Sequence, residues 1–143
     1  MDDYEGVQNR RTTNIAKRLR KLLMNYELAI AEADSQINLH IGKMKLLMGK
    51  ENIASQKKFI LEKVEVRKYE MYKDELLKAR SELLERIDIV LGRYYNKKMK
   101  EVFFMHFIQQ KTVQEIVAKT NLTSTAIEKI VSHQKNELLK IFH

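Results

Sequence analysis

Residues 112–127 decide the fold of this chain, and they read TVQEIVAKTNLTSTAI. Thr112 precedes Glu115 by three residues, which is the spacing of a capping box at the start of a helix. Asn121 tolerates the left-handed backbone that a tight turn needs, and Thr123 is a favoured N-cap for a second helix. The stretch therefore predicts two short helices joined by a tight turn.

This arrangement has the layout of a helix-turn-helix motif. Ile116 and Ile127 are placed to bury between the two helices, and Leu122 fills the elbow between them. The first turn after Thr123 is polar and short-chained, which a helix needs if its backbone is to approach base edges in the major groove of DNA. The pattern thus favours a second helix that reads DNA.

One helix is expected before this motif, and the second helix of the motif is expected to be long. Asn96 can cap a helix Lys97–Ile108, in which Phe103 and Phe107 are core residues. The helix that follows Thr123 is expected to run to about Phe142. Its buried stripe comprises Ile127, Ile130, Val131, Leu138 and Ile141.

The first two thirds of the chain carry two long apolar seams, each with alternating steps of three and four residues, which is typical of coiled-coil-like packing. The first seam, with a helix start at Thr12 or Thr13, comprises Ile15, Leu19, Leu22, Tyr26, Ala29, Ala33, Ile37, His40, Met44 and Leu47. The second runs from about Ile53 to Tyr95 and comprises Tyr69, Tyr72, Leu76, Ala79, Leu83, Ile87, Val90 and Tyr94.

A short connection at residues 48–52 favours an antiparallel hairpin of these two seams within one chain. A dimer that uses one or both seams is the alternative. Ala33–Ser35 weakens the first seam, which leaves one long helix or two. With no Pro and only four Gly, the fold class is all-α: a long N-terminal helical hairpin (1–75) and a C-terminal helix-turn-helix bundle (76–143).

Composition and motif content exclude several classes of protein. The chain has no Cys, and its four His lack ligand spacing, so we expect no disulfide, no metal and no cofactor. It has no Gly-rich phosphate loop and no catalytic signature, so we expect no enzyme. No apolar run approaches the roughly 20 residues that span a bilayer, and the acidic start is unlike a signal peptide. We expect a cytoplasmic protein that does not bind membranes.

The charge pattern points to double-stranded DNA as the partner. The net charge is +8, and residues 93–143 hold nine Lys and Arg against four Asp and Glu. The candidate base or groove contacts are Thr123, Ser124, Thr125, Ala126, Glu128, Lys129 and His133. The candidate phosphate contacts are Lys97, Lys98, Lys111, Thr112, Lys119 and Lys135. A second basic cluster is interpreted as a solvated helix face and comprises Arg10, Arg11, Lys17, Arg18, Arg20 and Lys21.

From about Leu83 to His143 the chain resembles the sigma-factor domain that reads the upstream promoter element. The segment Glu101–Phe107 fits that domain's preceding helix, except that Phe104 and His106 stand where basic surface residues are usual. Phe104 is therefore a candidate protein contact. Within the motif, the chain departs from the usual residues at Val117, Thr120 and Asn121.

The whole chain resembles the ArpU family of phage late-gene transcriptional regulators, through this domain and through Thr12–Leu19 followed by Tyr26. The resemblance implies a sequence-specific transcription regulator, an activator of phage or prophage late genes in a bacterial host. Its N-terminal part would then supply homodimerisation or contact with RNA polymerase. The alternative is a helical adaptor that binds RNA polymerase or another protein without binding DNA.

Overall fold

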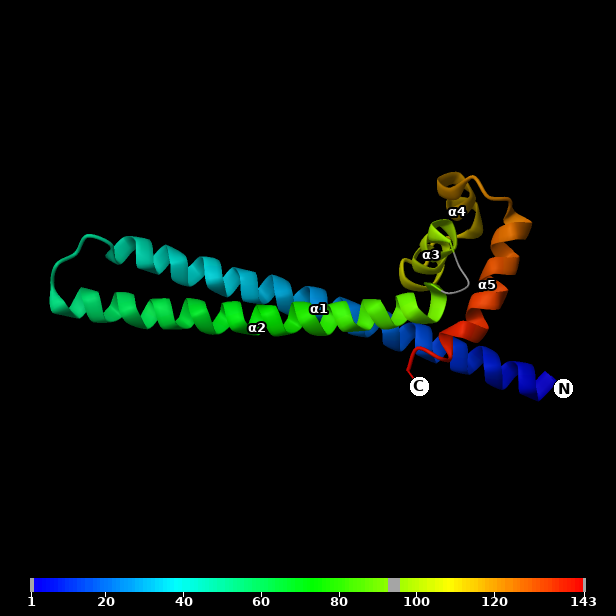
Figure 1. Cartoon of the computed structure of the whole chain (residues 1–143), viewed down its shortest axis with the longest axis horizontal. Coiled ribbons are helices and arrows are strands. Elements are labelled where there is room, and N and C mark those ends of the chain that lie inside the picture. The colour runs from blue at the N-terminus through cyan, green and yellow to red at the C-terminus, as the bar shows by residue number, and fades with distance from the viewer. Residues whose placement is uncertain (1, 93–95, 143) are drawn as a thin grey trace. The chain divides into compact units, whose positions relative to one another are not determined.

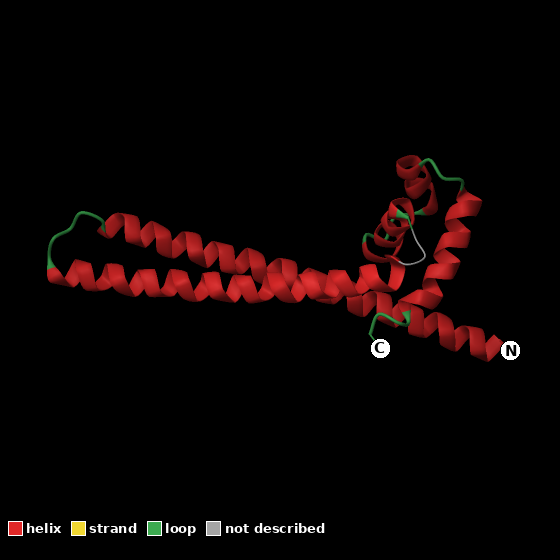
Figure 2. Cartoon of the chain, in the orientation of Figure 1, coloured by secondary structure: helices red, strands yellow, loops and turns green. Residues whose placement is uncertain are grey.

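The computed structural model describes residues 2–92 and 96–142, with side chains from residue 10 onward, and every element within these ranges is helical (Figures 1 and 2). The predicted all-α class is confirmed. In chain order, the elements are α1 (Asp2–Leu47), α2 (Ile53–Gly92), α3 (Lys97–Phe103), the π-helix η1 (Phe104–Ile108), α4 (Val113–Thr120) and α5 (Ser124–Leu138).

The chain divides into two compact units, and both long helices take part in both units. The first unit joins the chain up to Leu22 to the segment from Leu83 onward, and the second is Leu23–Glu82. This division differs from the predicted boundary after residue 75. The first unit includes the start of α1 because Ala16 and Leu19 are buried there.

In the second unit, α1 and α2 form an antiparallel pair connected by residues 48–52, where Gly49 has a φ of 80°. Two ion pairs show the direction of the pairing. Asp34 contacts Lys73 at 2.6 Å, and His40, later in α1, pairs with Glu62, which is earlier in α2. The His40 ring also stacks on Tyr69, with 5.8 Å between ring centroids. The predicted hairpin is therefore present within one chain.

Three details of the predicted long helices differ from the structure. First, α1 begins at Asp2, so Thr12 and Thr13 lie inside the helix and neither is its N-cap. The helix also continues without a break through Ala33, which is buried.

Second, in α2, Tyr72 is 48% exposed, because the seam passes through Lys73, which is held there by Asp34. Third, α2 ends at Gly92, and the predicted seam residue Tyr94 lies outside the described residues.

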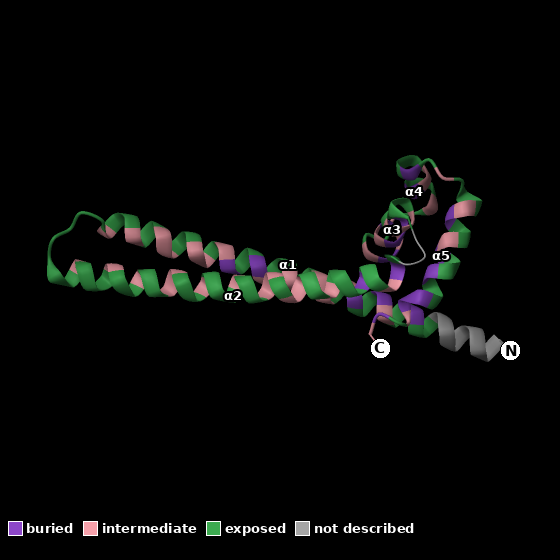
Figure 3. Cartoon of the chain, viewed as in Figure 1, coloured by how far each residue is buried: buried purple, intermediate pink, exposed green. Residues whose placement is uncertain are grey.

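The core of the first unit contains most of the buried side chains in the described chain, as Figure 3 shows. Phe103 lies at its centre and contacts Phe107 at 5.2 Å between ring centroids, which confirms both as core residues. Fully burying a side chain of this size contributes about 2 kcal/mol. The other apolar members of this core are Ala16, Leu19, Ile87, Leu91, Val102, Met105, Ile116, Ile127, Val131, Leu138 and Ile141.

The helix predicted as Lys97–Ile108 is two segments. Asn96 caps its start as predicted, and its side chain accepts a hydrogen bond from the Met99 amide at 3.0 Å. After Phe103 the backbone changes to the π-helix η1, in which the Gln109 amide donates to the Phe104 carbonyl. The wider turn shifts the register of the following side chains, which the apolar spacing alone does not reveal.

The last helix also ends earlier than predicted. α5 stops at Leu138, and a turn then carries Ile141 back into the core. The Arg18 guanidinium lies 4.4 Å from the centroid of the Phe142 ring. Across the described ranges, no helix combines the length and the apolar character that a membrane crossing requires.

The division into units predicts that a cavity in α1 loosens the C-terminal helices. Replacing Leu19, which is fully buried, by Ala should cost about 2–5 kcal/mol. We therefore expect Leu19→Ala to speed amide hydrogen exchange in α3, α4 and α5, measured by mass spectrometry. Leu61→Ala is the matched control, because Leu61 is 65% exposed. If amide hydrogen exchange became faster in α1 alone, the division of the chain into these two units would be contradicted.

Candidate nucleic-acid interface

The start of α4 is fixed by the predicted capping box at Thr112. The Glu115 amide donates to the Thr112 hydroxyl at 3.2 Å, and the Thr112 amide donates to a Glu115 carboxylate oxygen at 3.3 Å. These two bonds satisfy backbone donors that a helix start otherwise leaves open. They hold the first turn of α4 in one geometry.

The turn after α4 depends on two adjacent residues. Asn121 has a φ of 60°, in the left-handed region, and its amide donates to the Val117 carbonyl at 3.0 Å. The buried Thr120 hydroxyl donates to the Ile116 carbonyl at 2.7 Å and accepts from the Leu122 amide at 3.3 Å. The departures at positions 120 and 121 thus have a structural role, because both residues stabilise the turn.

α5 then begins at its predicted cap. The Thr123 hydroxyl accepts a hydrogen bond from the Ala126 amide at 3.1 Å. Ile116 and Ile127 are fully buried, and they hold one side of α4 and α5 in the core. The opposite side of α5 is left exposed.

The structure leaves most of the predicted base or groove contacts exposed, at the start of α5 or along this side, and only Ala126 is half-buried. The exposed members are Thr123, Ser124, Thr125, Glu128, Lys129 and His133. The first turn therefore presents short hydroxyl side chains next to a helix N-terminus, where the backbone carries partial positive charge. Such a surface can approach an anionic, hydrogen-bonding groove closely.

The predicted phosphate contacts include a pair of cations that the fold brings together. The neighbouring Lys119 side chain, followed by burial and the Lys119 charge, lowers the pKa of the Lys111 ammonium, and Glu115 partly opposes this shift. Two neighbouring ammonium groups repel each other, and a bound phosphate would relieve that repulsion. Lys111 comes just before the start of α4, and Lys119 lies in its last turn.

Other predicted phosphate contacts line a shallow hollow of about 370 Å³ at α3, η1 and α4. Lys97 and Lys119 lie at its rim together with Lys100, and the half-buried Phe104 contributes to its apolar surface. Lys98 and Thr112 are exposed elsewhere on the same unit. Glu101 also lines the hollow, which thus combines an apolar surface with three cations and one carboxylate.

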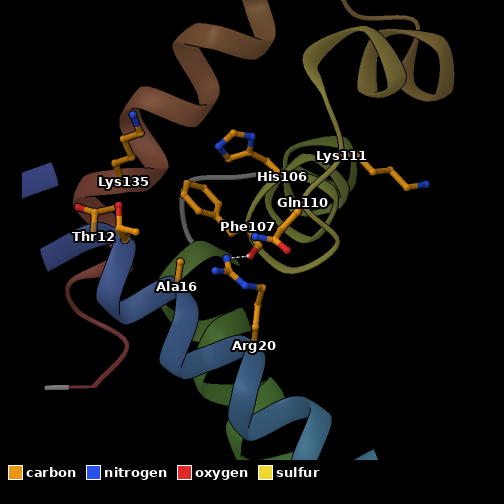
Figure 4. A pocket seen from close by; sticks show the side chains of 9 residues that line it. Thr12, Ala16, Arg20, His106, Phe107, Gln110, Lys111 and Lys135 are labelled. Atoms are coloured by element: carbon orange, nitrogen blue, oxygen red, sulfur yellow. Dashed lines mark hydrogen bonds between the residues drawn. The ribbon is translucent and has the colours of Figure 1, made fainter. Parts of the chain in front are cut away.

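Lys135 lies apart from these residues, in a second pocket of about 410 Å³ (Figure 4). The pocket also contains Arg20 and His106, and none of the described residues that line it carries a carboxylate. Lys111 reaches the rim of this pocket, but its side chain points away from the others in Figure 4. Within the first unit, basic residues from α1, η1 and α5 thus face one hollow.

Arg20 is an exception to the interpretation of the N-terminal basic cluster as a solvated helix face, since the other five members are exposed. Its guanidinium donates from Nη1 to the Phe107 carbonyl at 2.8 Å (Figure 4), and the residue is half-buried. The bond ties α1 to the end of η1, where the π-helix leaves that carbonyl accessible. Sequence reasoning missed this residue because its partner is 87 positions away.

His106, which the sequence marked only as a departure from the basic surface residues of sigma domains, also lines this pocket. Its Nδ1 atom is buried without a hydrogen-bond partner among the described residues. Burial, and then the positive charge of Lys135, lowers the pKa of His106 below 6.5. The imidazole is therefore neutral in the folded chain at neutral pH.

Gln134, on the buried side of α5, is a further polar residue that the apolar stripe did not indicate. Its side chain donates to the Met99 carbonyl at 2.8 Å and so connects α5 to α3. In the part of the chain that the structure describes, no three His, Cys, Asp or Glu residues group closely enough to hold a metal ion. The described residues of the site thus offer hydroxyl and cationic side chains, together with the Glu128 carboxylate.

The lowered pKa of His106 predicts a loss of stability in mild acid. Above pH 6.5 both folded and unfolded chains hold this residue neutral, but below it the unfolded chain takes up a proton that the folded chain resists. Stability should therefore fall as the pH drops from 6.5 to the lower folded pKa, measured by urea unfolding. His106→Gln should flatten this part of the profile and His133→Gln should not. If stability depended on pH equally in the wild type and in His106→Gln, a lowered pKa of His106 would be contradicted.

No family model matches this chain, and no curated protein or solved structure matches it either.

Proposed function

We propose that this protein is a sequence-specific transcription regulator that binds double-stranded DNA, with the helix starting after Thr123 in the major groove. One observation carries the proposal: the exposed first turn of α5 holds short polar side chains, and its direction is fixed by the turn at Asn121. A recognition helix needs both properties, because its backbone must come close to base edges in a defined orientation.

The arrangement of α4 and α5 supports this reading. They are separated by residues 121–123 and pack against each other through fully buried isoleucines. In a helix-turn-helix protein, the first helix crosses the backbone and the second enters the groove. Ser124, Thr125 and Lys129 would then contact bases, because all three are exposed: Ser124 in the first turn of α5, and Thr125 and Lys129 on the side opposite Ile127.

Cations at the ends of α4 and the start of α3 would position the protein on the DNA backbone. Lys111 and Lys119 form a like-charge pair, which a phosphate stabilises. Lys97 and Lys98 are exposed in the first turn of α3. These contacts would supply affinity without sequence preference, while α5 would supply the preference.

The resemblance to ArpU-family regulators and to the promoter-reading sigma domain supports a role in transcription. On that basis we propose that the protein activates late genes of a phage or prophage inside a bacterial host cell, and that it contacts RNA polymerase. Fold alone does not assign such a role. The proposal therefore depends on a specific DNA site near a promoter.

A protein adaptor is the second candidate, and the hollow at Phe104 favours it. Phe104 and Met105 line the hollow together with three lysines against one carboxylate, Glu101, and this net positive, partly apolar lining suits an acidic segment with apolar side chains. An adaptor would be sensitive to Phe104 and indifferent to the exposed face of α5. The two candidate functions thus predict different effects of substitutions in the same unit.

Selection of genomic DNA fragments tests the proposal. At about 0.15 M salt, where nonspecific binding is weak, the purified protein should retain a recurring site upstream of one operon. The variant Ser124→Ala, Thr125→Ala, Lys129→Ala should lose this enrichment. Lys78→Ala, Ser81→Ala is the control on an exposed face of α2 and should keep it. Equal retention by all three proteins, or by none, would overturn the proposal.

The like-charge pair makes a separate prediction about salt. Lys111→Ala, Lys119→Ala should weaken binding to all DNA sequences and lower the slope of log affinity against log salt concentration by about 2. Fluorescence anisotropy with labelled duplexes at several salt concentrations measures this slope. The control Lys57→Ala, Lys58→Ala, on exposed positions of α2, should leave the slope unchanged. A loss confined to one sequence would contradict the phosphate role.

A further inference from the structure

α1 carries a second stripe along the hairpin, on a face that α2 does not cover. Its seven members are all exposed and uncharged: Met24, Leu28, Ala31, Ser35, Leu39, Gly42 and Leu46. The four large side chains among them are between 50% and 75% exposed. Steps of three and four residues keep these positions on one side of the helix. The stripe extends over about 33 Å, at a rise of about 1.5 Å per residue.

This stripe is distinct from the seam that packs against α2. The seam passes through Tyr26, Ala33 and His40, and the stripe is displaced from it by about two residues, or roughly 200° around the helix. The two faces of α1 are therefore opposite each other. Contiguous exposed apolar faces of this kind are typical of interaction sites.

Gly42 gives independent evidence that something approaches this face. A side chain would be tolerated there within the chain, because a Cβ atom at Gly42 would meet nothing within 4 Å. Gly inside a helix costs about 1 kcal/mol relative to Ala. The packing of this chain on itself therefore does not require Gly42, whereas close packing of another helix on the same face would use it.

The charges along this part of α1 identify the partner as a second copy in reverse direction. Residues 23–34 carry three acidic residues and no Lys or Arg, and residues 35–50 carry three Lys and no Asp or Glu. Two copies in parallel would place like charges together. Two antiparallel copies would place the acidic half of each beside the basic half of the other.

We propose that two copies of this protein associate through this face of α1, antiparallel, with the two-fold axis near Ser35. In this register Leu28 of one copy lies opposite Gly42 of the other, and Leu39 lies opposite Ala31, so that large residues meet small ones. Glu27 then lies opposite Lys43. The proposal does not depend on DNA binding.

The ion pairs within the chain are compatible with this arrangement. Glu27 pairs with Arg80 at 2.5 Å and Asp34 with Lys73 at 2.6 Å, but their side chains remain 64% and 47% exposed. The Glu27 carboxylate can therefore also face Lys43 of a second copy. The exposed apolar residues of α2 are less suited to a seam, because charged residues such as Arg67 interrupt them.

Sedimentation equilibrium tests the association. The wild type should sediment as a dimer, and Leu28→Lys, Leu39→Lys should sediment as a monomer, because both charges enter the proposed interface. The exposed Ile60→Lys, Val64→Lys on α2 is the control and should stay dimeric. Circular dichroism should show equal helix content in all three, since every changed residue is exposed. A monomeric wild type, or dissociation by the control alone, would overturn the proposal.

Single cysteines test the orientation, because the natural chain has none. Under oxidation Ser35→Cys should form a covalent dimer. Leu46→Cys alone should not, but a mixture of Leu46→Cys and Met24→Cys should, because these positions lie opposite each other only in the antiparallel register. Self-linking of Leu46→Cys without cross-linking of the mixture would show a parallel dimer and contradict the proposed orientation.

Discussion

The direction of α5 depends on the short turn after α4. Asn121 takes a left-handed backbone there, and the Thr120 hydroxyl bonds to both the last turn of α4 and the turn itself. The Thr123 cap then starts α5 at once. Because these bonds are local and the isoleucines beside them are fully buried, the exposed side of α5 has one defined orientation in its unit.

Local features of this unit were predictable from the sequence. The caps at Asn96, Thr112 and Thr123 and the left-handed Asn121 each depend on residues within a few positions of one another. Helix periodicity likewise indicated the all-α class and the hairpin. Short-range spacing carries this information because caps and turns are decided by neighbouring backbone groups.

Features that depend on distant partners could not be predicted in the same way. Arg20 looked like part of a solvated face, but it bonds to the Phe107 carbonyl, which the π-helix leaves accessible. Gln134 interrupts an apolar stripe because it bonds to Met99 on another helix. The seam of α2 passes through Lys73 in place of Tyr72 because Asp34 is its partner. In each case the deciding partner lies far along the chain.

The two proposed surfaces would serve one function together. A recognition helix reads a short half-site, and a two-fold dimer would pair two such half-sites in an inverted repeat. The hairpin would then set how two reading units are combined, while the basic residues of α3, α4 and α5 would determine affinity. A DNA-reading unit that acted alone would not need so long a hairpin, whereas a dimer formed along α1 would use its length.

Affinity cleavage of the selected DNA site tests the central claim, that α5 lies in the groove, most directly. An iron chelate attached to Ser132→Cys, on the exposed side of α5, should cleave the DNA within the site in one or two short patches. The same chelate attached to Lys57→Cys on α2 serves as the comparison. Localised cleavage from α5 supports the account. Localised cleavage from α2 with none from α5 would contradict it.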